Sequence, residues 1–578
     1  MSCIEWKAIP QSLLPKLQSQ GRLEEAIGTL CGYSFVSRRE GDNASEVDRG
    51  EEYTADVAQQ AVAHIAEVFP SDDFANQAVW RAYMPHALRL LYTKTSVNAQ
   101  SKAKLSFWVG RCLDFDGRVP EAVRWLEECL RCREGLDEDD LDRLSSEHEL
   151  GVSYQANGQI EDAVRLLEHV VKVQDDTLAE THPDRLASQH QLGVSYQANG
   201  QIEDAVRLLE HVVKVQDDTL AETHPSRLAS QHQLSVSYQA NGQIEDAVRL
   251  LEHVVKVQDD TLAETHPDRL ASQHQLGVSY QANGQIEDAV RLLEHVVKVR
   301  DDTLTETHPS RLASQHQLSV SYQANGQIQD AVRLLEHVVK VQDDTLAETH
   351  PNRLQSQHAL GSSYWANGQI EDAVRLLEHV VKVQDDTLAE THPNRLASQH
   401  QLGVSYQANG QIQDAVRLLE HVVKVQDDTL AETHPDRLAS QHQLGVSYQA
   451  NGQIEDAVRL LEHVVKVQDD TLAETHPSRL QSQHALGSSY WANGQIEDAV
   501  RLLEHVVKVR DDTLAETHPD RLQSQHALGS SYWANGQIED AVRLLEHVVK
   551  VRDDTLAETH PNQLASEGWL RYIISHKE

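Results

Sequence analysis

The sequence is poor in cysteine, and its few thiols do not suggest disulfide bonding. The five cysteines all precede the repeats described below, and they are Cys3, Cys31, Cys112, Cys129 and Cys132. An odd number at irregular spacing does not resemble the disulfide framework of a small secreted domain. We therefore expect reduced thiols and a cytoplasmic protein.

Positive charge is scarce relative to negative charge. The chain of 578 residues has 51 Lys and Arg against 90 Asp and Glu, which gives a formal net charge of −39. Such a charge repels phosphate backbones and anionic lipids, because both are bound through clustered Lys and Arg. No apolar run approaches the roughly 20 residues that span a bilayer, and residues 1–20 lack the pattern of a signal peptide. We expect no nucleic acid and no membrane as partner.

Aromatic residues are also rare, at 5% of the chain, but aliphatic residues recur with a fixed period of 42 residues. Each of ten copies carries a Gly or Ser at the same place, namely at positions 151, 193, 235, 277, 319, 361, 403, 445, 487 and 529. A period of this length is typical of a solenoid, in which each unit buries its apolar face only by stacking on its neighbours.

Each copy predicts an antiparallel helical hairpin. Residues 183–198 have apolar residues at helical spacing and begin with Pro183, which suits the first position of a helix. Asn199 and Gly200 then allow the chain to reverse. A second amphipathic helix is predicted from about residue 202 to residue 220. Two small residues, Gly193 and Ala205, stand where we expect the two helices to approach closely.

These residues carry a resemblance to a known family. Leu192, Gly193, Tyr196, Gly200 and Ala205 match the spacing of the tetratricopeptide signature, and the 42-residue length with its Glu-Thr-His-Pro linker is similar to the kinesin-light-chain subtype. The resemblance implies an all-α fold, a right-handed superhelical solenoid of antiparallel helical hairpins, preceded by a small, mostly helical N-terminal region. It covers roughly residues 103–565.

A second resemblance concerns the first hundred residues. The stretch from Ile9 to Phe35 is similar to the winged-helix piece of fungal NB-ARC/tetratricopeptide receptors, which are NLR-like proteins of the STAND class, and residues 68–88 resemble their connector. The chain contains no phosphate-binding G-x-x-x-x-G-K-[ST] loop, so nucleotide switching is not implied. The expected organisation is a partial winged-helix-like segment over 1–60, a helical connector over 61–100, a divergent first repeat over 101–140, ten near-identical repeats over 141–561 and a capping helix over 562–578.

No residue pattern suggests catalysis, a cofactor or a metal centre. Cys129 and Cys132 have a spacing that can bind zinc, but a closed site needs four ligands, and we expect buried thiols instead. Three histidines recur in each copy, for example His169, His182 and His190. We expect them on the surface or at helix caps, with a pH-sensing ladder near pH 6 as the alternative. The evenly spread acids are typical of a solvated face, so we expect no enzyme.

The copies differ mainly where the family lines its concave groove. In the second copy the resemblance assigns the groove to Ala187, His190, Val194, Gln197 and Ala198. Three copies carry Gln, Ser and Trp at the positions of Ala187, Val194 and Gln197, respectively. The predicted partner-binding residues are Gln355, His358, Ser362, Trp365, Gln481, His484, Ser488, Trp491, Gln523, His526, Ser530 and Trp533. Trp is typical of interface anchors; alternatively, one variant unit spread by duplication and Trp only covers its neighbour.

The sequence thus predicts a scaffold or ligand-sensing array that binds a peptide or partner protein in its groove. If the second resemblance holds, it is the sensor part of a fungal NLR-like non-self-recognition receptor. The alternatives are a kinesin-light-chain-like cargo adaptor and an enzyme with its site in residues 1–100. Trp569, Tyr572, Ile573 and Ile574 lie on the last expected helix, which caps the stack or mediates self-association.

Overall fold

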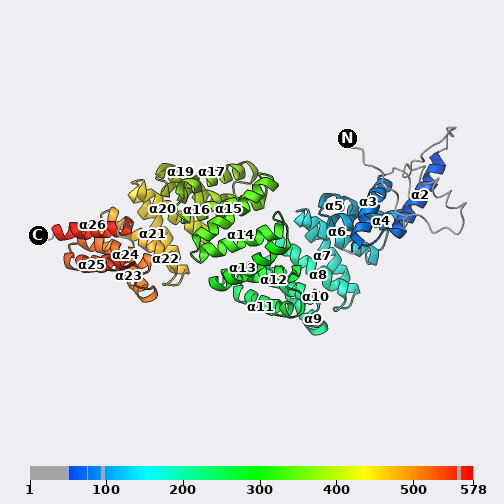
Figure 1. The fold of residues 1–578 in the computed structure, drawn as a ribbon, viewed down its shortest axis with the longest axis horizontal. Coiled ribbons are helices and arrows are strands. Elements are labelled where there is room, and N and C mark those ends of the chain that lie inside the picture. The colour runs from blue at the N-terminus through cyan, green and yellow to red at the C-terminus, as the bar shows by residue number, and fades with distance from the viewer. Residues whose placement is uncertain (1–50, 74–75, 93–97, 556–560, 577–578) are drawn as a thin grey trace. The chain divides into compact units, whose positions relative to one another are not determined.

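The computed structural model describes residues 51–73, 76–92, 98–555 and 561–576, and all regular secondary structure in these ranges is helical (Figure 1). Residues 1–50, which hold most of the predicted winged-helix-like segment, lie outside the described residues. The helices are α2 (Glu51–Val68), α3 (Gln77–Leu91), α4 (Ala99–Phe115), α5 (Val119–Arg133), α6 (Leu141–Ala156), α7 (Ile160–Thr177), α8 (Pro183–Ala198), α9 (Ile202–Thr219), α10 (Pro225–Ala240), α11 (Ile244–Thr261), α12 (Pro267–Ala282), α13 (Ile286–Thr303), α14 (Pro309–Ala324), α15 (Ile328–Thr345), α16 (Pro351–Ala366), α17 (Ile370–Thr387), α18 (Pro393–Ala408), α19 (Ile412–Thr429), α20 (Pro435–Ala450), α21 (Ile454–Thr471), α22 (Pro477–Ala492), α23 (Ile496–Thr513), α24 (Pro519–Ala534), α25 (Ile538–Thr555) and α26 (Pro561–Ser575).

The chain divides into two compact units, one ending at Leu292 and one beginning at Leu293. In the first unit, α2 and α3 pack on the hairpin α4–α5 around a core that includes Trp80, Leu105 and Trp125. The hairpins α6–α7, α8–α9 and α10–α11 and the helix α12 follow. The second unit contains six complete hairpins, from α14–α15 to α24–α25, and ends in the single helix α26.

The ends of each hairpin follow from a few residues. At α8 the His182 Nδ1 atom accepts a hydrogen bond of 3.2 Å from the Asp184 backbone N–H, and Pro183 occupies the first turn. Gly200 has a φ of 80°, which allows the tight reversal into α9. The second helix ends at Thr219, one residue before the predicted Leu220.

Helices within a hairpin approach closely at small residues, as predicted. Ala205 is fully buried, and a Cβ atom on Gly193 would lie 2.7 Å from the Leu209 Cγ atom. Any larger side chain at Gly193 therefore requires Leu209 to move.

Neighbouring hairpins share one apolar seam. In the second unit, Val374, Leu377 and Val381 of α17 pack against Leu402 of α18, with Leu418 of α19 at the edge. Equivalent clusters recur from copy to copy. Because the buried area lies between hairpins, stacking stabilises the array more than the isolated hairpin does. Each unit is therefore a helical solenoid of antiparallel hairpins, which confirms the predicted all-α architecture. No helix among the described residues combines the length and hydrophobicity needed to cross a bilayer.

Candidate functional site

The twelve predicted binding residues lie on three first helices of the second unit. On α16 they follow one stripe, because Gln355, His358, Ser362 and Trp365 are three, four and three residues apart. The equivalent stripes lie on α22 and α24. The three Gln residues are exposed, while the His and Ser residues are half-buried. Trp365 and Trp491 keep 38% and 39% of their surface exposed, which is unusual for so large an apolar ring.

Trp533 differs from the other two, because the chain's own last helix covers part of it. The rings of Trp569 and Tyr572 on α26 lie 5.6 and 5.4 Å from the Trp533 ring, both in an edge-to-face arrangement. Trp533 is consequently half-buried. Of the three Trp residues, Trp365 and Trp491 are therefore the more exposed.

The Gln that Trp replaces is a structural residue in the ordinary copies. The Gln407 Oε1 atom accepts hydrogen bonds from Ser447 Oγ at 2.7 Å and from Gln443 Nε2 at 2.6 Å, both on the next first helix. Trp365 cannot accept such bonds, and the Ser405 hydroxyl of the next first helix donates to its own Gln401 carbonyl oxygen at 2.9 Å instead. The change from Gln to Trp thus removes contacts between repeats and leaves an exposed ring.

A fourth linked difference was not among the predicted site residues. Where ordinary copies carry the Gln of Gln443, the three Trp-bearing copies carry Ala359, Ala485 and Ala527. On α16 the Ser362 hydroxyl takes over part of the lost contact, since it accepts from Gln323 Nε2 at 3.3 Å. The same comparison between copies that identified the other positions contains this signal.

The groove histidines form a regular row of contacts between consecutive first helices, which we call the histidine ladder. In each rung the His Nδ1 atom lies 3.0 to 3.3 Å from the Ser Oγ atom of the next first helix. The rungs are His148–Ser188, His190–Ser230, His232–Ser272, His316–Ser356, His358–Ser398, His400–Ser440, His442–Ser482, His484–Ser524 and His526–Ser566.

Burial lowers the pKa of the ladder histidines below their usual value. The pKa falls to about 4 at His316, at His442 and at His526. At His484 burial is again the main cause of a pKa of about 4, and the Arg510 guanidinium adds to it. These rings are therefore neutral at pH 7 and at pH 6, which contradicts a pH-sensing ladder near pH 6. The expected capping role holds for His182, whereas His190 is half-buried and forms a rung.

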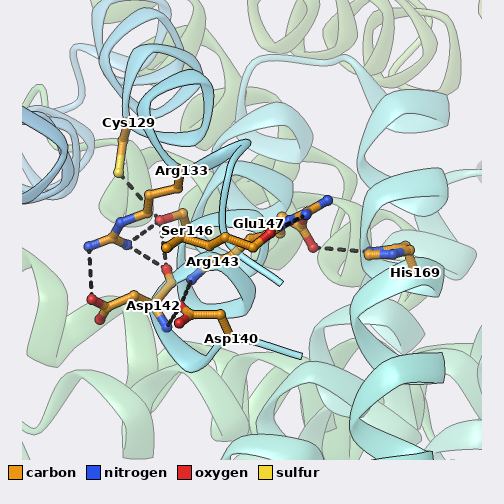
Figure 2. Close-up of polar contacts among 9 residues, drawn as sticks. Cys129, Arg133, Asp140, Asp142, Arg143, Ser146, Glu147 and His169 are labelled. Carbon is orange, nitrogen blue, oxygen red and sulfur yellow. Dashed lines mark hydrogen bonds and ion pairs between the residues drawn. The ribbon is translucent and has the colours of Figure 1, made fainter. Parts of the chain in front are cut away.

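Buried arginines donate to a serine of the next first helix at several junctions, two of which belong to the ladder and one of which, at Ser146, has no rung histidine. Figure 2 shows the arrangement in the first unit, where Arg133 of α5 donates to Ser146 of α6, and Cys129 Sγ lies 3.3 Å from the same hydroxyl. In the second unit Arg510 donates to Ser524 and Arg552 donates to Ser566, which are the serines of the last two rungs.

Among the described residues, the cysteines are Cys112, Cys129 and Cys132, which are buried or half-buried and form no disulfide. Burial raises the pKa of Cys112 to about 12 and also raises the pKa values of Cys129 and Cys132. Within the part of the chain that the structure describes, no three His, Cys, Asp or Glu side chains converge on a possible metal position.

Two shallow depressions lie between consecutive second helices and the first helix that joins them, away from the predicted residues. One of 610 Å³ in the second unit is lined by residues that include Glu420, Lys424, Tyr448 and Arg459, and an equivalent one lies in the first unit. Its acids and bases pair locally; for example, Tyr448 donates to Glu420 at 2.8 Å. This surface recurs in ordinary copies and has no feature specific to the Trp-bearing ones.

Comparison with known proteins identifies the family of the repeats. A family model described as tetratricopeptide repeat matches nine overlapping stretches that extend from residues 142–218 to residues 478–554. A nucleotide-binding leucine-rich repeat (NLR)-like protein of Hyaloscypha variabilis is 29% identical over 102 residues, which are 16% of this chain. The matching stretch spans only 10% of the length of that relative.

Among solved structures, a putative kinesin light chain of Podosopora anserina with nearly identical TPR-like repeats is 58% identical, with a TM-score of 0.33 over 36% of this chain and 98% of the other. BtubC (BKLC) of P. vanneervenii is 17% identical, with a TM-score of 0.33 over 41% of this chain and 93% of the other. The family model covers well over half of the sequence, and the helical hairpins have the matching period. The chain therefore belongs to the tetratricopeptide repeat family.

Proposed function

We propose that the array is a scaffold that binds a peptide or partner protein on the face formed by its first helices, with Trp365 and Trp491 as the main anchors. One observation carries this proposal. In both places an exposed Trp stands where ordinary copies use Gln to hold the next repeat. A residue that gives up contacts within the fold and exposes a large apolar ring is better explained by binding than by packing.

The test compares the chain with the variant Trp365→Gln/Trp491→Gln in partner capture from the native host. Gln is the residue of the ordinary copies, so the helical fold is kept, and circular dichroism verifies this. We expect the variant to lose proteins that the parent chain captures. A matched control, Tyr92→Gln/Leu141→Gln, changes two exposed apolar residues outside this face. Equal capture by the Trp variant and the parent chain would refute the proposal.

We further propose that this face is the sensor of an NLR-like receptor in the cytoplasm. The local similarity to the Hyaloscypha protein supports the first part, and free, buried Cys112 and Cys129 support the second, because reduced thiols persist in that compartment. This role requires a nucleotide-binding module in the native gene product. Immunoblotting of the host with an antibody against the repeats tests it, and a single native species near 64.9 kDa would contradict it.

A further inference from the structure

In two rungs of the histidine ladder, the surrounding contacts decide which ring nitrogen carries the hydrogen. In the last two rungs, Arg510 and Arg552 donate to the rung serines, so each serine hydroxyl has its own hydrogen free to donate to the His Nδ1 atom. Since these rings are neutral, the remaining nitrogen, Nε2, carries the proton. The tautomer is thus fixed by contacts inside the fold.

The Nε2 atoms of three ladder histidines keep some contact with the surface. Among the described residues, the Nε2 atoms of His358, His484 and His526 make no hydrogen bond, and none of them belongs to the buried polar atoms that lack a partner. They therefore reach the surface of the first helices. Ordinary copies share this feature, because their rungs use Nδ1 in the same way; His400 and His442 are examples.

The distance between consecutive rungs indicates which backbone conformation of a bound peptide matches the ladder. Consecutive first helices touch through the His–Ser contacts, so their axes are about 8 to 10 Å apart. A polyproline II helix repeats every three residues, or about 9.3 Å, and has no internal hydrogen bonds, so its carbonyl oxygens are free. A β-strand returns to the same face after about 6.6 Å. An α-helix uses its carbonyls internally.

The side chains around the ladder also fit such a guest. On α16 and α22 the four groove positions carry Gln, Ser, Trp and His, none of which has a formal charge at pH 7, although the whole chain is strongly acidic. The charged groups that act on neighbouring ladder histidines are Asp436 at His400, and Arg510 and Asp520 at His484. Exposed aromatic rings beside uncharged donors are the features with which proteins hold polyproline II segments.

We propose that the face of the second unit binds an uncharged polyproline II segment, whose main-chain carbonyls accept one hydrogen bond from each ladder histidine while Trp365 and Trp491 hold its ring-bearing side chains. In this arrangement the ladder histidines bind the main chain of the guest, and contacts with Trp365 and Trp491 determine the position of the segment along the face. This proposal rests on the proposed binding function and names the class of guest.

The experiment uses a fluorescein-labelled peptide of twelve prolines and a Gly-Ser peptide of the same length. Fluorescence anisotropy with the full chain should show binding of the proline peptide, at least tenfold tighter than that of the Gly-Ser peptide and unchanged between low and high salt. Absence of proline-peptide binding, or equal binding of both peptides, overturns the proposal.

Two sets of substitutions isolate the hydrogen bond. His400→Asn, His442→Asn and His484→Asn keep an acceptor in the place of Nδ1 and remove the Nε2–H donor, while Gln at the same positions keeps a donor near Nε2. Because a hydrogen bond contributes roughly 0.5 to 1.5 kcal/mol, each Asn should weaken binding about 3- to 10-fold, and Gln should restore most of it. Equal losses with Asn and Gln, or no loss with Asn, overturn the proposal.

A matched control changes histidines of the second helices. His421→Asn, His463→Asn and His505→Asn remove rings that lie near Glu390, Glu432 and Glu474, and peptide binding should be unchanged. If the Trp variants lose a native partner but the proline peptide does not bind, the scaffold function stands and the polyproline II proposal falls.

Discussion

Acidification from pH 7 to pH 5.5 should destabilise the second unit through its ladder histidines. In the folded chain the pKa of His316, His442, His484 and His526 is lowered to about 4, mainly by burial. In the unfolded chain a histidine has a pKa of about 6.5. Between these values the unfolded state binds more protons, so stability is complete above pH 6.5 and is lost as the pH falls towards 4.

The size of the effect follows from the two pKa values. At pH 5.5 each of these histidines removes about 1 kcal/mol of the stability present at pH 7. Four of them together remove up to about 4 kcal/mol, and solvent reaching the ring edges reduces this figure. For a unit of this size, a loss of 1 kcal/mol lowers the melting temperature by about 2 to 4 °C. A fall of roughly 10 °C is therefore expected.

The assay is thermal unfolding followed by circular dichroism at pH 7.0, 6.25 and 5.5. Most carboxylates remain ionised in this window, because their reference pKa values are about 3.9 to 4.3. The variant with Asn at His316, His442, His484 and His526 serves as control, and its melting temperature should depend much less on pH. A parent chain whose melting temperature does not change would refute the reasoning. So would imidazole NMR signals of these four histidines that titrate near pH 6.5.

Three further predictions concern packing, capping and thiol reactivity. Gly403→Val should cost about 1 to 3 kcal/mol in urea unfolding, because a Cβ atom at this position would lie 2.7 Å from Leu419 Cγ. Gly403→Ser should cost less, since Ser235 and Ser319 occupy this position in other copies. Equal costs for the two variants would contradict the steric argument. His392→Ala should lower stability by about 1 kcal/mol, since His392 Nδ1 caps α18 at the Asn394 N–H, and an unchanged urea midpoint would exclude this role. Cys112, whose pKa burial raises to about 12, should resist iodoacetamide at pH 8 until guanidinium unfolds the chain, which peptide mass spectrometry measures; rapid labelling of the folded chain would show that the thiol is accessible.

The sequence was sufficient to predict the hairpins because the signals for their ends are local. Pro183 fixes the first turn of α8 and Gly200 supplies the positive φ of the reversal, and the observed helix bounds agree with the prediction to within one residue. The 42-residue period then predicted the stacking, since identical apolar faces can be buried only against one another.

The ladder could not be predicted in the same way, because its contacts join residues 40 positions apart. Nothing in the local pattern of His358 shows that its Nδ1 atom meets Ser398 of the next first helix. The expectation of surface or capping histidines was right for His182, but it did not include the contact of the half-buried His190 with Ser230. The contact of Trp533 with Trp569 was missed for the same reason, since it depends on how α26 stacks on its neighbour.

The structure explains the substitution to Ala at one junction, where two Trp-bearing copies are adjacent. A Trp offers no acceptor to the Gln of the next first helix, so Ala is the compatible neighbour, and Ala527 follows Trp491 in this way. At that junction the Ser531 hydroxyl donates to the Ala527 carbonyl oxygen at 2.9 Å, so no serine is left unpaired. Packing against a preceding Trp accounts for Ala527 without a guest, but not for Ala359 and Ala485, which follow the ordinary Gln323 and Gln449. It does not account for the exposed Trp ring itself, because Trp365 stands before an ordinary copy with Gln401 and gains no such partner. Trp365 is therefore the residue at which duplication and binding make opposite predictions, and its single replacement by Gln should weaken partner capture only if binding is the reason for the ring.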